Sequence, residues 1–193
     1  MMRTAWGYEV DGTISPIISV DQFNQMTGGA YTGNPRIESA LAAASQAIRN
    51  HCGWHVAPSM SCVAHPVGGT HVMRLPAAYV SAIAKVTEDG VELADYEWRS
   101  DGLLRNKRRW CEKWNGVEVE YTAGYDSAAV PDLAEAVCAI AAGVLSVSAG
   151  VTSESADGVT ISYRQDAASI AASLTSQQKS ALEPYKVVSS HAA

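Results

Sequence analysis

Apolar residues recur at helical spacing in two separate stretches of the chain. The first stretch carries Ile37, Leu41, Ala44 and Ile48. The second carries Leu133, Val137, Ile140, Ala141, Val144 and Leu145. Each stretch therefore has one apolar face to bury against other elements. We predict two main helices, over about residues 35–50 and 131–147, the first opened by Asn34 and Pro35 and the second by Pro131.

The pattern between these helices, over about residues 56–125, is typical of short strands. Val117, Val119 and Tyr121 alternate with polar residues, as they do in a strand with one buried face. Asp-Gly pairs at residues 89–90 and 101–102 indicate tight hairpin turns. We predict a small antiparallel sheet here, with strands over residues 71–75, 80–87, 91–93, 96–99, 103–105 and 117–122.

The two ends of the chain are expected to be less regular. The N-terminal residues before Asn34 are predicted to be mostly irregular, apart from a short helix opened by the capping box of Ser19 and Gln22. The C-terminal part is predicted as a series of short elements: a strand or extended arm over residues 159–163, a helix capped by Asp166, a helix opened by Thr175 and Gln178 and ended by Pro184, and a free tail over residues 187–193.

Together these elements predict an α+β fold. We expect a small antiparallel helical bundle, with a β-rich insert of antiparallel strands and hairpins between the two main helices and a C-terminal helix and tail. The length of 193 residues fits one such domain. Residues 1–165 are expected to form its core, and residues 166–193 the C-terminal helices and tail.

Composition changes this picture in two respects. Hydrophobic residues make up 47% of the chain and charged residues 18%, but Ala, Ser and Thr replace many larger side chains. This composition fits a subunit that buries much of its surface against neighbours, and a GC-rich genome would explain it equally well. The net charge of -6 argues against a broad basic face for nucleic acid. For the basic run Arg105, Lys107, Arg108 and Arg109, a solvated or salt-bridged hairpin tip is favoured over DNA contact.

The chain shows no sign of export or of membrane insertion. Its first residues lack a positive region followed by an apolar one, so we expect no secretory signal. The longest apolar run, residues 136–151, is interrupted and falls short of the ~20 residues that span a membrane, so we expect no membrane contact. We expect Cys52, Cys62, Cys111 and Cys138 to be reduced thiols.

Candidate catalytic and metal-binding residues gather between His51 and His71. His51, Cys52 and His55 could supply a nucleophile and a base, and Cys62, His65 and His71 add further ligand types for zinc. Their spacing matches no catalytic motif and only loosely matches a zinc site, so we predict no catalytic residue, no metal and no cofactor. A zinc- or cysteine-dependent enzyme using this region remains the alternative function, and a ligand-binding domain is a third.

The strand-rich insert carries the residue types that are most often energetic at protein interfaces. They are Trp98, Arg105, Arg108, Arg109, Trp110 and Trp114. We predict that they form a subunit interface. Tryptophan in a small sheet is equally often a core residue, and this alternative stays open.

The chain resembles the head-tail connector, or adaptor, proteins of long-tailed bacteriophages over most of its length. The residues that carry the resemblance are Leu41 to Ile48 with Cys52-Gly53-Trp54, Arg74-Leu75-Pro76 before Val80 to Ile83, Glu88 to Val91, Asp101 to Arg105, Val119 to Tyr125 followed by Val130 to Leu133, and then Ser153 to Ser155, Thr160 to Tyr163, Leu174-Thr175, Leu182 and Tyr185. The chain departs from the family in two places: Ala77-Ala78-Tyr79 stands where a second proline is expected, and the second main helix lacks the Arg expected near Gly143.

The resemblance implies a structural role in the neck of the virion. It implies a closed ring, with twelve subunits as the favoured number, that joins the portal protein to a head-completion (stopper) or tail-terminator protein. Genomic DNA would pass through the ring without sequence-specific binding, and assembly would take place in the host bacterial cytoplasm. We expect the β insert to contact the helical core of the next subunit. Portal docking is expected to use Leu182, Tyr185, Lys186, Val187 and Val188.

Overall fold

The computed structural model describes residues 1–146, 153–156, 159–162 and 174–187. They belong to two compact units, each built from separate stretches of the chain. Unit 1 combines Met1–Ser15, Arg49–Ala129 and Glu183–Ala193, and unit 2 combines Pro16–Ile48 and Val130–Leu182. The predicted mixture of helices and antiparallel strands is confirmed.

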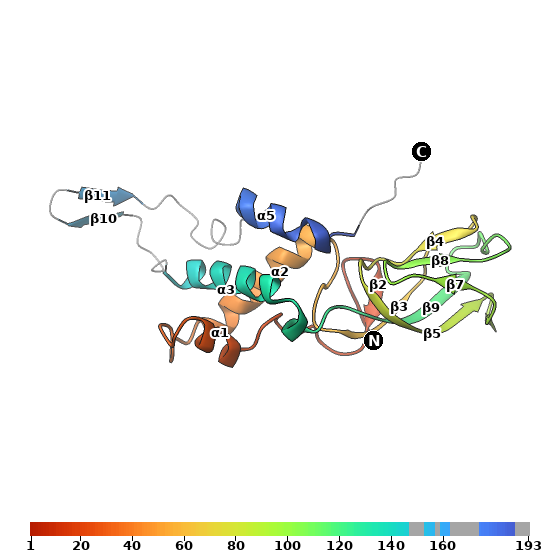
Figure 1. Cartoon of the computed structure of the whole chain (residues 1–193), viewed down its shortest axis with the longest axis horizontal. Coiled ribbons are helices and arrows are strands. Elements are labelled where there is room, and N and C mark those ends of the chain that lie inside the picture. Colours follow the sequence, from red (N-terminus) through yellow and green to blue (C-terminus); the bar gives the residue numbers. More distant parts are fainter. Residues whose placement is uncertain (147–152, 157–158, 163–173, 188–193) are drawn as a thin grey trace. The chain divides into compact units, whose positions relative to one another are not determined.

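The largest element of unit 1 is an antiparallel sheet with the strand order β1-β2-β3-β9-β5-β6 (Figure 1). The strands are β1 (Met2–Arg3), β2 (Tyr8–Val10), β3 (Met60–Ala64), β9 (Val117–Ala123), β5 (Val80–Glu88) and β6 (Val91–Glu92). β9 lies near the centre, paired with β3 on one side and β5 on the other. Its buried and half-buried residues alternate along the whole strand, which confirms the predicted alternation from Val117 to Tyr121.

A second, smaller sheet completes unit 1, with the order β4-β8-β7. Its strands are β4 (Val72–Arg74), β8 (Leu103–Arg105) and β7 (Glu97–Trp98). Both predicted Asp-Gly turns are present: one connects β5 to β6 and the other connects β7 to β8. Gly90 and Gly102 have φ angles of 80° and 79°, in the left-handed region that glycine adopts without strain.

The prediction of a mostly irregular N-terminus is wrong in one respect. β1 and β2 pair with each other, and β2 extends the main sheet by pairing with β3. None of these three strands is in the predicted set. β1 and β2 have two and three residues, which is too short for a period-2 pattern to be recognised. β2 is held by β3, about fifty residues away in sequence, and β1 is held by β2.

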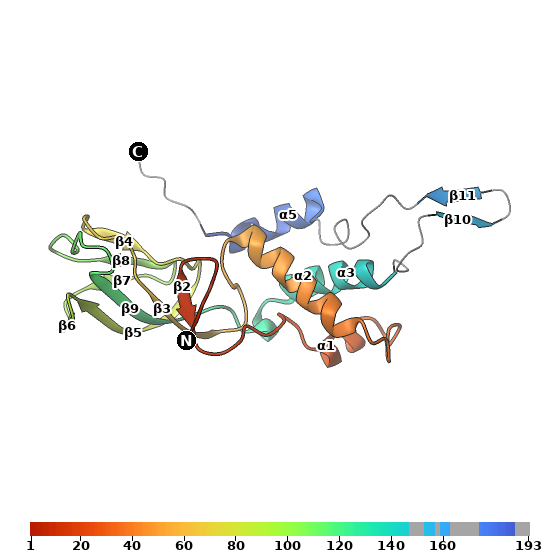
Figure 2. The same ribbon diagram turned by 180° about the vertical axis from the view of Figure 1, so that it is seen from behind.

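Unit 2 holds the helices and a short β-hairpin (Figures 1 and 2). Its helices are α1 (Val20–Met26), most of α2 (Ile37–Cys52, whose last turn belongs to unit 1), α3 (Pro131–Ser146) and α5 (Ser176–Leu182). The predicted apolar faces of α2 and α3 are buried, except that Val144 is half-buried. Both predicted capping boxes form: Ser19 with Gln22, and Thr175 with Gln178.

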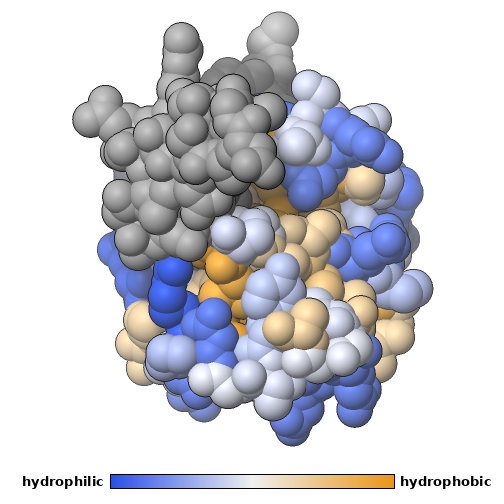
Figure 3. Space-filling model, turned by 90° about the vertical axis from the view of Figure 1, so that its left-hand side faces the viewer, coloured by the Kyte–Doolittle hydropathy of each residue, from blue (hydrophilic) through white to orange (hydrophobic). Residues whose placement is uncertain are grey.

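The remaining described elements are short. The 3₁₀ turns η1 (Ser127–Ala129) and η2 (Glu183–Tyr185) belong to unit 1, and β10 (Ser153–Ala156) pairs with β11 (Val159–Ser162) as an antiparallel hairpin. The helix predicted at Asp166 lies outside the described residues. Within the described ranges, no helix has the length and apolar character needed to cross a membrane. Apolar residues reach the surface among hydrophilic ones on the side shown in Figure 3.

Candidate interaction surfaces

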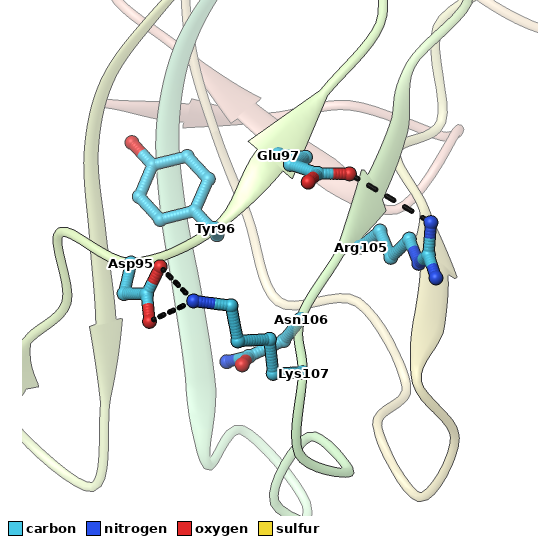
Figure 4. A pocket seen from close by; sticks show the side chains of 6 residues that line it. All are labelled: Asp95, Tyr96, Glu97, Arg105, Asn106 and Lys107. Atoms are coloured by element: carbon cyan, nitrogen blue, oxygen red, sulfur yellow. Dashed lines mark hydrogen bonds and ion pairs between the residues drawn. The ribbon is translucent and has the colours of Figure 1, made fainter.

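Three of the four cations of the basic run form ion pairs within unit 1, and Figure 4 shows two of these pairs. Arg105 lies on β8, 3.8 Å from a carboxylate oxygen of Glu97, and Lys107 lies 3.1 Å from Asp95. Arg108 forms an ion pair with the buried carboxylate of Glu88. With Tyr96 and Asn106, the first two pairs line a shallow pocket. The salt-bridged tip is therefore the correct alternative for these three cations, and Arg109 is exposed beside them.

The three tryptophans of the insert lie in different environments. Trp110 is 1% exposed, so its indole belongs to the core of unit 1, the alternative that the sequence leaves open. Trp98 on β7 is 39% exposed. Trp114 is 97% exposed and lies in the loop before β9. Only Trp98 and Trp114 can contact another molecule without a change of fold.

Trp114 lines a groove that the sequence did not reveal. The other residues of the groove are Arg3, His65, Pro66, Val67, Gly68, Glu112, Lys113 and Asn115. Val67 is 89% exposed, so the groove presents two large apolar side chains to solvent. Arg3 and Val67 reach it from β1 and from the segment after β3, and no local sequence pattern joins these distant segments.

The predicted portal-docking residues are held mostly by their own chain. Leu182 in α5 is 1% exposed and Tyr185 is 9% exposed. The Trp54 indole donates a 2.6 Å hydrogen bond to the Tyr185 carbonyl oxygen, and the Val187 amide donates to the Cys52 carbonyl oxygen at 3.0 Å. The Tyr185 ring also packs edge-on against Tyr125.

Of the two other predicted docking residues, only Lys186 lies in the part of the chain that the structure describes. The Lys186 ammonium lies 3.0 Å from Glu183, and Val188 lies outside the described residues.

The side chains that were considered as zinc ligands have separate partners in the structure. His51 lies 3.8 Å from Glu183 and His65 lies 3.9 Å from Glu118, while His71 faces the Asn106 carbonyl oxygen. Over the part of the chain that is described, no three His, Cys, Asp or Glu residues come close enough to hold a metal ion.

The cysteines of this region are also poorly suited to nucleophilic chemistry. Burial raises the pKa of the Cys52 thiol to about 12, and it raises the pKa of the Cys62 thiol to about 12 as well. A thiol of this kind stays protonated at neutral pH, and the nucleophile is the thiolate.

His55 belongs to a buried network of hydrogen bonds inside unit 1. Its Nε2 lies 3.0 Å from the Ala123 carbonyl oxygen, so Nε2 carries the proton and Nδ1 accepts from the Tyr8 hydroxyl at 2.7 Å. The same hydroxyl accepts from the His55 amide at 2.9 Å. Arg49 donates to the carbonyl oxygens of Ser15, His55 and Ala57. These side chains are satisfied by structural partners, which is the arrangement of a polar core.

Comparison with known proteins identifies the fold. A family model for head completion proteins matches residues 16–188. A chain in the virion of a native gene transfer agent (GTA) particle is similar, with a TM-score of 0.59 and 20% sequence identity over 94% of this chain and 95% of that chain. A chain in the neck of the empty GTA particle, computed with C6 symmetry, has a TM-score of 0.58 and 19% identity over 78% of this chain and 90% of that chain.

A third similar chain comes from the neck of the native GTA particle, computed with C12 symmetry. Its TM-score is 0.57 at 18% identity, over 78% of this chain and 89% of that chain. At these identities the likeness shows a shared fold. No curated protein matches the sequence.

Proposed function

The chain belongs to the head completion protein family, and from this premise we propose how it works where the head and tail of a phage-like particle meet. It is a structural protein of the head-tail neck, as the resemblance to connector proteins implied. The observation that carries this function is the family match, which extends over residues 16–188 and so includes unit 2 and most of unit 1. The zinc- or cysteine-dependent enzyme is not supported, because the buried His and Cys side chains serve the fold.

We propose that the protein acts as a closed ring, of twelve subunits, around the DNA channel. Chains of the same fold occur in necks that were computed with C6 and C12 symmetry, which supports a ring. On one side the ring would bind the portal protein, and on the other a stopper or tail-terminator protein. In this scheme residues 1–165 are the connector core, with the helices as a small antiparallel bundle, and residues 166–193 are the docking part.

The exposed members of the predicted interface set are the ones we propose to contact the next subunit. They are Trp98, Arg105, Arg108, Arg109 and Trp114. Trp110 supports this surface from within the core. Contacts that close a ring are heterologous, so this patch must meet a different patch on the neighbour.

Portal docking is proposed for the segment that follows α5. The buried side chains of Leu182 and Tyr185 would fix its path, while Lys186, Val187 and Val188 would reach the portal. Assembly with the portal is proposed to take place in the host bacterial cytoplasm.

Loss of the protein in an otherwise complete particle tests this role. We expect electron micrographs of the deletion to show DNA-filled heads and separate tails, and a wild-type copy supplied in trans to restore joined particles. Antibody labelling of restored particles should mark the head-tail junction. Joined, infectious particles in the absence of the protein would contradict the proposal.

A further inference from the structure

Unit 1 exposes two large apolar side chains next to each other in one groove. Trp114 is 97% exposed and Val67 is 89% exposed, and both line the groove with Pro66. Isolated apolar residues at a surface are ordinary, but an indole and an aliphatic side chain in one groove form the type of patch that marks a protein contact.

The loop that carries Trp114 is fixed in place before any partner binds. The Cys111 amide donates to a carboxylate oxygen of Glu88 at 2.7 Å, and Lys113 forms a 2.9 Å ion pair with Asp89. The hydrogen bond from Lys113 holds the pKa of the Asp89 carboxyl below its usual value, so the pair is charged at neutral pH.

The facing segment is fixed as well. The Gly69 amide donates to the Trp110 carbonyl oxygen at 2.9 Å, and a Cβ on Gly68 would collide with the Cys111 carbonyl oxygen. A contact surface that is already ordered loses little conformational freedom on binding.

We propose that this groove is the subunit contact that receives the exposed face of helix α3 from the next copy of the chain. The inference rests on the proposed ring, because a ring closes only when two different patches of one chain fit each other. It goes beyond the ring in naming Trp114 and Val67 as the main contact residues of the groove, and α3 of the next copy as the element that they bind.

The exposed face of α3 carries two small residues, Ala139 and Gly143, against which a protruding indole can pack. Glu135, Ala139 and Gly143 follow at four-residue spacing and are all exposed, so they form one line along the helix. A Cβ added at Gly143 would meet no atom within 4 Å among the described residues. Glycine is disfavoured inside a helix, and packing within the described chain gives no reason for it here. Close approach by a neighbouring chain would give one.

Charge supports this pairing through individual residues and not through whole units. Unit 2 holds three of the fourteen Lys and Arg residues, Arg36, Arg164 and Lys179, but seven of the twenty Asp and Glu residues. Unit 1 holds the other eleven cations and thirteen acidic residues, so both units carry a net negative charge.

Within the groove, Lys113 is paired with Asp89 and His65 lies near Glu118. Arg3 and Glu112 form no ion pair with a described residue, and neither does Glu135 on α3. We therefore place Glu135 of the next copy against Arg3.

The protein concentration needed for ring formation by the full chain tests the contribution of Trp114 and Val67 directly. Native mass spectrometry over a protein dilution series, alone and with the cognate portal ring, gives the concentration at which half of the wild-type chains are in rings. We expect Trp114→Ala and Val67→Ser each to raise this concentration at least about tenfold, because a buried hot-spot side chain is lost. Val91→Ser is the matched control, since Val91 is 64% exposed on β6 outside the groove.

The thermal unfolding of these variants should stay at the wild-type midpoint, because the replaced side chains are exposed. Rings of Trp114→Ala that form at the wild-type concentration would overturn the inference. If such rings fail only to join the portal or a tail-side component, the groove belongs to that partner, and the inference is also overturned. Wild-type chains that never form a ring, alone or on the portal, would refute the proposed function itself.

A charge exchange tests whether α3 of the next copy binds in the groove. We expect Arg3→Glu and Glu135→Arg each to weaken assembly and the double variant to recover most of the wild-type behaviour. Gly143→Leu should abolish assembly without lowering the unfolding midpoint, because Gly143 is exposed and a Cβ there meets no described atom within 4 Å. If the double variant assembles no better than the single variants, and Gly143→Leu forms normal rings, then α3 is not the element that binds in the groove.

Discussion

At the scale of single residues, the polar core around His55 is the feature that most constrains unit 1. Its imidazole is fully buried between Tyr8 and the end of β9, and burial lowers the pKa of His55 to about 4. The neutral tautomer with the proton on Nε2 satisfies every ring nitrogen. A second proton on Nδ1 would face the Tyr8 hydroxyl and break the arrangement in which that hydroxyl donates to it.

This network makes the stability of the protein depend on pH. Below about pH 6.5 the unfolded chain binds a proton at His55 and the folded chain does not, so the folded state loses stability as the pH falls toward about 4. Between about pH 7 and pH 5 we expect His55 to lower the free energy of unfolding by about 2 kcal/mol. Urea unfolding at both pH values measures the loss.

A matched pair of variants identifies the source of the pH effect. His55→Asn should be less stable at neutral pH but should show a smaller loss between the two pH values, whereas His65→Asn, at a partly exposed position, should behave like the wild type. An unchanged pH dependence in His55→Asn would contradict the assignment.

Gly68 and Gly143 differ in the space that is available for an added Cβ. Gly68→Ala should lower the free energy of unfolding by about 1–3 kcal/mol, because its Cβ would overlap the Cys111 carbonyl oxygen. Gly143→Ala, in the open surroundings of α3, should raise it by up to about 1 kcal/mol through helix propensity. Calorimetry on both variants checks the signs, and equal effects would show that the close approach at Gly68 is not a constraint.

The residues of the candidate surfaces show what sequence alone can predict. Residue types favoured the insert as an interface, which stays a prediction, but Trp110 and Trp114 are four positions apart and have opposite exposure. The difference depends on the pairing of the segment around Thr70 with Trp110, which is a contact between distant parts of the chain. The same limit hides Arg3 and Val67, since neither residue is unusual in its local context.

At the scale of elements, the segment after α5 is attached to unit 1 by backbone and aromatic contacts. Trp54 and Cys52 bind it through its Tyr185 carbonyl and Val187 amide, and Tyr125 packs between the rings of Tyr79 and Tyr185. Removal of residues 184–193 should therefore lower the free energy of unfolding by roughly 2–4 kcal/mol, through lost packing and an unpaired indole N–H.

The control for this truncation is a chain that ends at Val187. It keeps all of these contacts, so it should be more stable than the shorter chain by the same roughly 2–4 kcal/mol. Denaturant unfolding of both chains gives the comparison. Equal stability of the two truncations would show that Tyr185 does not anchor the segment.

Elements differed in how well the sequence predicted them. The helices were found within about two residues at each end, because apolar periodicity, capping boxes and Pro131 act locally. β1, β2 and β3 were missed because such short strands are defined by their partners in the sheet and not by their own residues.

At the scale of the whole molecule, the charge agrees with the proposed passage of DNA through the ring. The net charge is -6, and three of the four cations of the basic run, Arg105, Lys107 and Arg108, are held in ion pairs. We expect fluorescence anisotropy with a labelled duplex at moderate salt to show no saturable binding, and Lys107→Ala to change nothing. Tight binding that weakens steeply with added salt would mean that these cations are free to neutralise phosphates.

The central claim is that this chain is a neck protein that assembles with the portal as a ring. The most direct test is the mass of the purified protein, alone and mixed with its cognate portal ring, by native mass spectrometry or light scattering. We predict a ring on the portal, formed either before or upon mixing, with a mass that corresponds to twelve chains of 20.4 kDa. A monomer whose mass does not change in the presence of the portal would contradict the claim.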